Sequence, residues 1–112
     1  MNAADTTPPA DPLQERAERI EAEFARREAA ALAMGGPEKL ARRKAAGVLD
    51  ARERLARLLD PGSFIESGRF STSANPADRD RSPSDGKIAG FGRIDGREAA
   101  VVSNDFTVFG AS

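Results

Sequence analysis

The chain has 112 residues, 39% of them hydrophobic and 31% charged, and its formal net charge of −1 gives no overall field that favours nucleic acid or a membrane surface. It contains no cysteine and no histidine, which excludes disulfides, thiolate metal sites, cysteine nucleophiles and a histidine general base. No apolar run approaches the roughly 20 residues that cross a bilayer, and the N-terminus lacks the features of a signal peptide. We therefore expect a cytoplasmic protein without nucleic-acid or membrane partners.

Three helices are predicted in the first half of the chain. Residues 1–12 are polar and rich in proline, which is typical of a disordered tail. Asp11 and Pro12 then form a helix-start signal. Apolar residues recur at helical spacing until Gly35 and Gly36 end the pattern, and they form a narrow stripe. The stripe consists of Leu13, Ala17, Ile20, Phe24, Ala31 and Met34. It suits packing on a partner helix or subunit, or equally an ordinary surface helix.

A second helix begins at Pro37 and is strongly basic. Asp50, with Glu53 three residues later, predicts a capping box that opens a third helix. The residues 60–62, Asp-Pro-Gly, provide turn chemistry that stops it. We therefore expect a helical region at 13–60 and a different structure at 61–112.

The second half is predicted to form strands. Residues 63–70 are expected to contain a short strand, and 71–86 a long, mobile loop without large apolar residues. Asp95-Gly96 between two β-like runs predicts a type I′ hairpin. Gly90 and Gly92 on one strand face indicate that another backbone or a helix packs closely there. The run Ala-Ala-Val-Val at 99–102 is apolar on both faces, which favours a sheet that is covered on both sides. This short chain has at most three helices to provide that cover, so we expect the sheet to be the beginning of a larger structure.

Two sequence blocks carry a family resemblance. The block GVLDARERLARLLDPGSFIE at 47–66, and DGKIAGFGRIDGREAAVVSNDFTVFGAS at 85–112, resemble the N-terminal region of the carboxyltransferase β-subunits of biotin-dependent acyl-CoA carboxylases. The similarity covers about residues 35–112. Val48 and Asp50 replace a Lys and a Thr of the family pattern, and Ala111 replaces its second Gly.

The resemblance implies an α/β (α+β) fold class, with N-terminal helices followed by the first β-hairpin of a crotonase-like spiral domain. It implies an enzyme family that moves a carboxyl group from carboxybiotin, held on a carrier protein, to the α-carbon of an acyl-CoA. Backbone N–H groups in oxyanion holes stabilise the enolate and the biotin oxyanion in such a mechanism. Implied partners are the acyl-CoA substrate, a biotin carboxylase or biotin carrier subunit, and further copies in a homo-oligomer.

A family subunit with two such domains needs far more residues than this chain has. We therefore expect an N-terminal fragment, in which the acyl-CoA carboxyltransferase domain starts at residue 61 and is incomplete. We expect this fragment to lack the oxyanion-hole loops and the catalytic residues. By itself it is expected to bind no cofactor and to be inactive. The alternative is a non-catalytic interaction module made of the first helix and the hairpin.

Small residues at the end of the chain are the candidate site. The resemblance implies that the loop Gly110, Ala111 and Ser112 could place backbone N–H groups beside the acyl-CoA, whereas small residues there also simply permit close packing. Ala111 at positive φ would cost about 1 kcal/mol relative to Gly.

Charged residues elsewhere have simpler explanations. Lys39, Arg42, Arg43 and Lys44 could meet coenzyme A phosphates, although a solvated helix face or an inter-subunit contact is the stronger interpretation. Asp105 is expected to hydrogen-bond at the strand end. Asp78, Asp80 and Asp85 lack the spacing of a calcium loop, and no metal is expected there.

Overall fold

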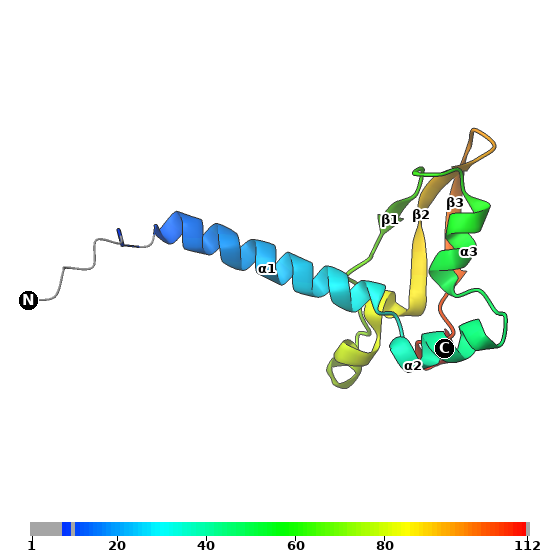
Figure 1. Ribbon diagram of the computed structural model, residues 1–112, viewed down its shortest axis with the longest axis horizontal. Helices are drawn as coiled ribbons and strands as arrows, with labels where there is room; N and C mark the ends of the chain where they lie inside the picture. The colour runs from blue at the N-terminus through cyan, green and yellow to red at the C-terminus, as the bar shows by residue number, and fades with distance from the viewer. Residues whose placement is uncertain (1–7, 10, 112) are drawn as a thin grey trace, which may run out of the picture.

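The computed structural model describes residues 8–9 and 11–111. The described residues form three helices and a three-stranded antiparallel sheet of order β1-β2-β3 (Figure 1). The helices are α1 (Pro12–Leu32), α2 (Pro37–Ala45) and α3 (Ala51–Leu58), and the strands are β1 (Ile65–Ser67), β2 (Lys87–Ile94) and β3 (Arg97–Asn104). The order of helices followed by a hairpin agrees with the prediction. Most of the predicted tail, residues 1–7 and 10, lies outside the described residues.

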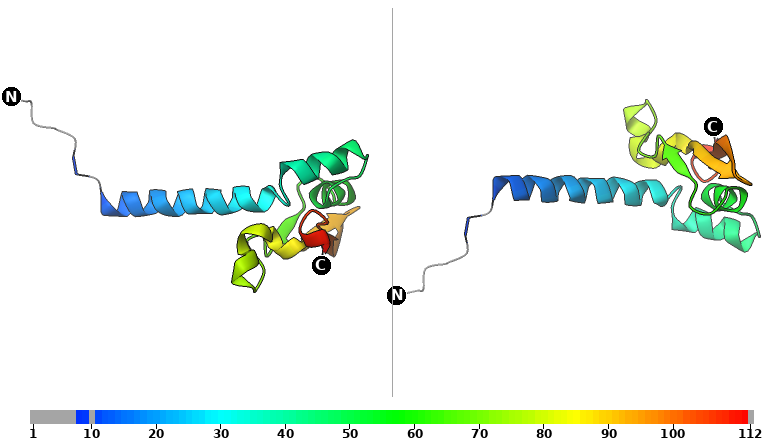
Figure 2. Two further views of the ribbon diagram at one scale, coloured as in Figure 1. Left: turned by 90° about the horizontal axis from the view of Figure 1, so that it is seen from below. Right: turned by 90° about the horizontal axis from the view of Figure 1, so that it is seen from above.

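Helix α1 extends away from the rest of the chain (Figures 1 and 2). The structure as a whole measures 67 × 36 × 30 Å. The Asp11 carboxylate accepts a 3.0 Å hydrogen bond from the Leu13 N–H, as the predicted N-cap requires. The helix ends at Leu32, before the predicted glycine stop, because Met34 adopts the left-handed conformation at φ 53°. Much of the predicted stripe is solvent-exposed, since Leu13 is 75% and Ile20 61% exposed.

Helix α3 covers one face of the sheet. It begins with the predicted capping box, in which the Glu53 N–H donates to the Asp50 carboxylate at 2.8 Å and the Asp50 N–H donates to Glu53 at 3.2 Å. Its inner side contributes to a small core whose buried members are Met34, Ala51, Leu55 and Ile88. This core joins the end of α1, helix α3 and strand β2.

The hairpin between β2 and β3 has the predicted turn. Asp95 and Gly96 both have positive φ, 50° and 80°, as a type I′ turn demands. The Asp60 carboxylate, which follows α3, accepts hydrogen bonds from the Asp95 and Gly96 N–H groups at 2.9 and 2.8 Å. Close packing at the two strand glycines is also confirmed: a Cβ on Gly90 would lie 2.1 Å from the Ile65 carbonyl oxygen, and one on Gly92 would lie 2.7 Å from Leu59.

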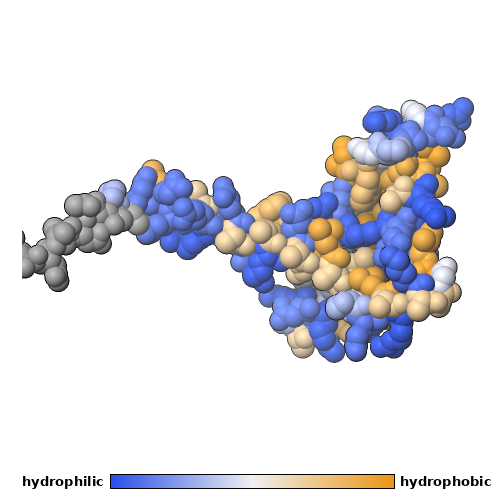
Figure 3. Space-filling model, viewed as in Figure 1, coloured by the Kyte–Doolittle hydropathy of each residue, from blue (hydrophilic) through white to orange (hydrophobic). Residues whose placement is uncertain are grey.

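The opposite face of the sheet is open, which confirms the prediction that this chain does not supply cover for both faces of its apolar sheet. The register places Ile65 opposite Phe91, and Phe91 opposite Ala100, on that face. Ile65 is 72%, Phe91 61% and Val102 68% exposed. Figure 3 shows hydrophobic surface around the strands, in contrast to the mostly hydrophilic surface of α1. We call Ile65, Phe91, Ala100 and Val102 the open sheet face.

The prediction of a loop without structure at 71–86 is wrong. This segment forms two short 3₁₀ helices, η1 (Pro76–Arg81) and η2 (Pro83–Gly86). The hydroxyl of Ser82, which is 1% exposed, accepts from the Ser73 N–H at 2.8 Å and donates to the Asp78 carbonyl at 2.7 Å. The Ser84 hydroxyl donates to the Arg69 carbonyl at 2.8 Å. Small hydroxyl side chains replace large apolar ones as the internal contacts, which is why hydropathy gave no signal.

None of the helices in the described part of the chain is both long and apolar enough to cross a membrane.

Candidate functional site

The residues that follow strand β3, 105–111, form the candidate site, and we call them the C-terminal loop. Asp105 fixes its start. The Asp105 side chain accepts from the Thr107 N–H at 2.9 Å and from the Thr107 hydroxyl at 2.5 Å, and Asp105 is only 2% exposed. Its own N–H donates to the Gly86 carbonyl at 2.9 Å. The predicted hydrogen-bonding role of Asp105 is therefore confirmed, and its buried carboxylate is directed at the loop's own backbone.

Thr107 connects the loop to the turn between α1 and α2. The Gly35 N–H donates to the Thr107 hydroxyl oxygen at 2.9 Å. A Cβ on Gly35 would lie 2.0 Å from the Thr107 carbonyl oxygen, so any side chain there would push the two segments apart. The glycine that the sequence assigned to helix termination is thus required for close approach. This contact joins residues 72 positions apart, and the local sequence held no signal for it.

Three basic side chains donate hydrogen bonds to backbone carbonyl oxygens in the loop and just before it. The Lys39 ammonium group lies 3.4 Å from the Thr107 carbonyl oxygen. Arg54 donates to the Asn104 carbonyl at 2.8 Å, and Lys87 donates to the Ala111 carbonyl at 3.2 Å. Cations beside these oxygens hold the loop's carbonyl groups in place.

Only part of the basic run of α2 contacts the C-terminal loop. Lys39 contacts Thr107, and the Arg43 guanidinium lies 5.2 Å from the centre of the Phe106 ring, a cation–π distance. Arg42 and Lys44 are exposed. Two members of the run therefore support the C-terminal loop, a use that their sequence spacing did not reveal.

The predicted binding residues lie at the end of this loop. Gly110 is exposed at φ 60°, and Ala111 has φ 66° in the 3₁₀ turn η3 (Phe109–Ala111). Ala111 thus adopts the conformation that favours glycine. Phe109 turns outwards, and the Arg81 guanidinium lies 5.2 Å from its ring centre. Ser112 lies outside the described residues.

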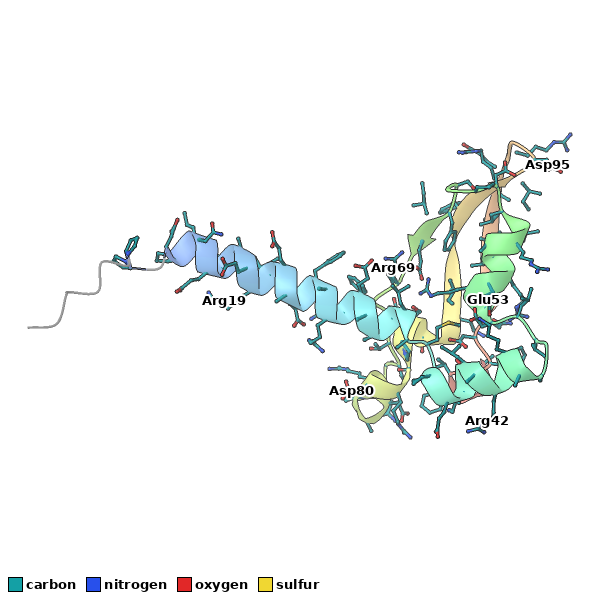
Figure 4. The ribbon with its side chains drawn as sticks, in the orientation of Figure 1. Arg19, Arg42, Glu53, Arg69, Asp80 and Asp95 are labelled. Carbon is teal, nitrogen blue, oxygen red and sulfur yellow. The ribbon has the colours of Figure 1, made fainter. Side chains whose placement is uncertain are left out.

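Away from the loop, a chain of ion pairs joins three elements (Figure 4). Arg52 on α3 donates two 2.9 Å hydrogen bonds to the Glu66 carboxylate on β1. Arg69 donates to Glu66 at 2.7 Å and to Glu28 on α1 at 2.9 Å. Burial opposes ionisation of Glu66, whose side chain is 2% exposed, but the hydrogen bonds from Arg52 and Arg69 outweigh it and lower its pKa.

Of the acidic residues at 78–85, Asp78 has local partners. Asp78 pairs with Arg81 and accepts from the Asn75 amide at 3.2 Å. Among the residues that the structure describes, no group of three or more acidic side chains could hold a metal ion.

These features coincide with a family match. The chain belongs to the carboxyl transferase domain family, whose model matches residues 42–112. The matched region runs from the basic end of α2 through α3, the sheet and the C-terminal loop.

The chain is similar to propionyl-CoA carboxylase beta chains. The chain is 47% identical over 88 residues to the mitochondrial propionyl-CoA carboxylase beta chain of Sus scrofa, a match that covers 74% of this chain and 16% of the relative. It is 46% identical over 78 residues to a putative propionyl-CoA carboxylase beta chain of Bacillus subtilis, covering 70% of this chain and 15% of the relative. The chain therefore spans about a sixth of the length of these relatives.

Solved structures of carboxyltransferases are also similar to this chain. The transcarboxylase 12S hexamer with hydrolysed methylmalonyl-coenzyme A bound matches with a TM-score of 0.75 and 36% identity, covering 92% of this chain and 20% of that one. A single-chain, multi-domain long-chain acyl-CoA carboxylase matches with a TM-score of 0.75 and 31% identity over 83% of this chain and 11% of that one. The helices and the three-stranded sheet are thus the fold of one part of a carboxyltransferase.

Proposed function

We propose that this chain supplies one segment of a carboxyltransferase that moves a carboxyl group from carboxybiotin to the α-carbon of an acyl-CoA. The crotonase-like spiral fold, the biotin partner subunit and assembly into a homo-oligomer belong to this proposal, as does a role in fatty acid metabolism in the cytoplasm. The observation that carries it is the family match over residues 42–112, which ends on the C-terminal loop.

The geometry of that loop supports a binding role. Asp105 and Thr107 fix the loop backbone from within, and Lys39 and Lys87 bind its carbonyl oxygens. Arg54 binds the Asn104 carbonyl oxygen just before the loop. Backbone groups that are fixed before the substrate arrives need no reorganisation in the transition state. On this basis we assign the acyl-CoA contact to Gly110, Ala111 and Ser112. We assign no role in proton transfer to any side chain of this segment.

A chimera tests the proposal. This chain replaces the matching segment of the Bacillus subtilis relative, and carboxyl transfer between acyl-CoA and biotin is measured. We expect the chimera to retain transfer activity, and the 112-residue chain alone to have none. A chimera that assembles like the unmodified relative but neither binds nor carboxylates acyl-CoA would contradict the proposal.

The exposed stripe of α1 supports a second candidate function. Leu13 and Ile20 are 75% and 61% exposed on a helix that projects from the fold, which suits a non-catalytic module that docks a partner helix. This alternative predicts that deleting residues 8–30 from the chimera abolishes assembly with a partner, whereas the carboxyltransferase proposal predicts that transfer depends on the loop residues.

A further inference from the structure

The outer half of α1, residues 12–25, carries apolar side chains that face solvent. Leu13, Ile20 and Phe24 are each more than half exposed, and this half of the helix projects from the rest of the chain (Figure 2). Further along the helix the same stripe reaches Ala31, which is buried. The stripe therefore packs into the core of this chain at its inner end and is left exposed at its outer end.

The spacing of the exposed residues is that of a coiled-coil seam. Leu13, Ala17, Ile20 and Phe24 follow one another at intervals of four, three and four residues, which is the pattern of alternating d and a positions in a heptad repeat of about 3.5 residues per turn. The next d position is Arg27, which ends the apolar seam. A helix that rests on a globular core has a wider apolar face, so this narrow seam favours one helix as its partner.

One antiparallel register would cover the whole seam with the same segment of a second copy. In that register Leu13 lies against the partner's Phe24, and Ala17 lies against the partner's Ile20. Each pair occurs twice because the arrangement has two-fold symmetry. The two folded parts would then lie at opposite ends of the paired helices, since α1 projects from the fold (Figures 1 and 2). The seam is thus complementary to itself in shape.

Charges beside the seam favour the same register. Arg16 and Glu23 occupy g positions, and the register places Arg16 opposite the partner's Glu23. Arg16 has no ion pair with any described residue. Hydrogen bonds from Arg26 and Arg27 lower the pKa of Glu23 to about 2, and its side chain is 46% exposed, so it is a charged acceptor that a further cation can reach. A parallel pairing would instead place Glu23 opposite the partner's Glu28, which is repulsive.

We propose that α1 is a dimerisation arm, whose outer half pairs antiparallel with the same segment of a second copy of this chain. As one contact of the homo-oligomer, the arm rests on the proposed function; as a pairing of two helices, it is tested by itself. The overlap is short, so a single pair of arms binds weakly. Such a contact gains strength when the copies are also joined elsewhere, because the second contact then forms within one assembly.

Sedimentation equilibrium of the 112-residue chain tests the arm. Every sample carries Phe91→Asp, so that the open sheet face cannot drive association. We expect a dimer whose fraction rises with chain concentration. Ile20→Glu should abolish it, since a charge then lies within the seam. Ala22→Glu, which introduces the same carboxylate at an exposed position outside the seam, is the matched control and should leave the dimer unchanged.

Charge reversal then tests the register. Arg16→Glu replaces two attractive contacts of the dimer with two repulsive ones and should weaken dimerisation by about tenfold. Adding Glu23→Arg should restore the dimer, whereas a parallel dimer would be restored by Glu21→Arg, because the parallel register places Arg16 opposite the partner's Glu21.

Three results would overturn the proposal: a chain that stays monomeric at about 1 mM, a dimer that survives Ile20→Glu, or a double variant of Arg16→Glu with Glu23→Arg that remains as weak as Arg16→Glu. Circular dichroism of each variant establishes that a lost dimer does not come from a melted helix. Because the readout is self-association, its failure leaves the carboxyl-transfer test untouched.

Discussion

Asp105 is the residue on which the C-terminal loop most depends. Its buried carboxylate is the acceptor for two donors of Thr107, and removing an acceptor leaves buried donors without partners. The role of Asp105 could be predicted only in part from the sequence. A carboxylate at a strand end indicated hydrogen bonding, but Thr107, which donates to it, also accepts from the Gly35 N–H in the other half of the chain.

Replacing Asp105 by Ala should therefore lower the free energy of unfolding by about 2–4 kcal/mol, since two donors lose their acceptor. Urea denaturation followed by circular dichroism measures the change. Glu98→Ala, at an exposed strand position, serves as the control and should shift stability by less than about 0.5 kcal/mol. An equally small effect at Asp105 would show that the loop does not depend on this carboxylate.

Substitution of Ala111, unlike that of Asp105, is expected to stabilise the chain. Its φ of 66° is costly for a residue with a Cβ, so Ala111→Gly should stabilise the chain by up to about 1 kcal/mol. Ala100→Gly, at an exposed position of β3, is the control and should destabilise it. Thermal unfolding of both variants decides the matter, and a loss of stability in Ala111→Gly would mean that the strain is absent in solution.

At the scale of elements, the helices and the hairpin were predictable because each has a local signal: caps, periodicity or an Asp-Gly turn. The organisation of 71–86 was not, because serine hydroxyls supply its internal bonds. The uncovered second face was predictable, since the pattern of 99–102 indicates a need for cover on both faces that three helices cannot meet. The pattern does not specify what supplies that cover.

The ion pairs of Glu66 predict a pH dependence. The folded-state pKa of Glu66 is lowered, so its stabilisation is complete above the unfolded value of about 4.3 and is lost as the pH falls through the folded value. We expect the free energy of unfolding to fall between about pH 7 and about pH 3, and this fall to be smaller in Glu66→Gln. Urea titrations at both pH values provide the comparison. The same fall in the variant would assign the effect to other carboxylates.

The strand glycines should differ in their tolerance. A methyl group on Gly90 meets the Ile65 backbone, whereas one on Gly92 meets the movable end of the Leu59 side chain. We expect Gly90→Ala to cost about 3 kcal/mol and Gly92→Ala about 1 kcal/mol. Amide hydrogen exchange should show loss of protection at the β1–β2 pairing only in Gly90→Ala. Equal costs for the two variants would contradict the close approach of β1.

For the molecule as a whole, one side of the sheet is sheltered by α3 and the other is left to water. Ile65, Phe91 and Val102 remain more than half exposed, and large apolar patches of this kind mark interaction sites. The chain spans about a sixth of the length of its relatives. We infer that other parts of a carboxyltransferase cover the open sheet face.

Phe91→Asp, made both in this chain and in the chimera with the Bacillus subtilis relative, tests that claim most directly. In the chain alone the side chain is 61% exposed, so unfolding in urea should change by less than about 0.5 kcal/mol. In the chimera the new carboxylate would be buried without a partner, and we predict loss of the assembled species in sedimentation velocity. A Phe91→Asp chimera that assembles and transfers carboxyl groups like its parent would contradict the account.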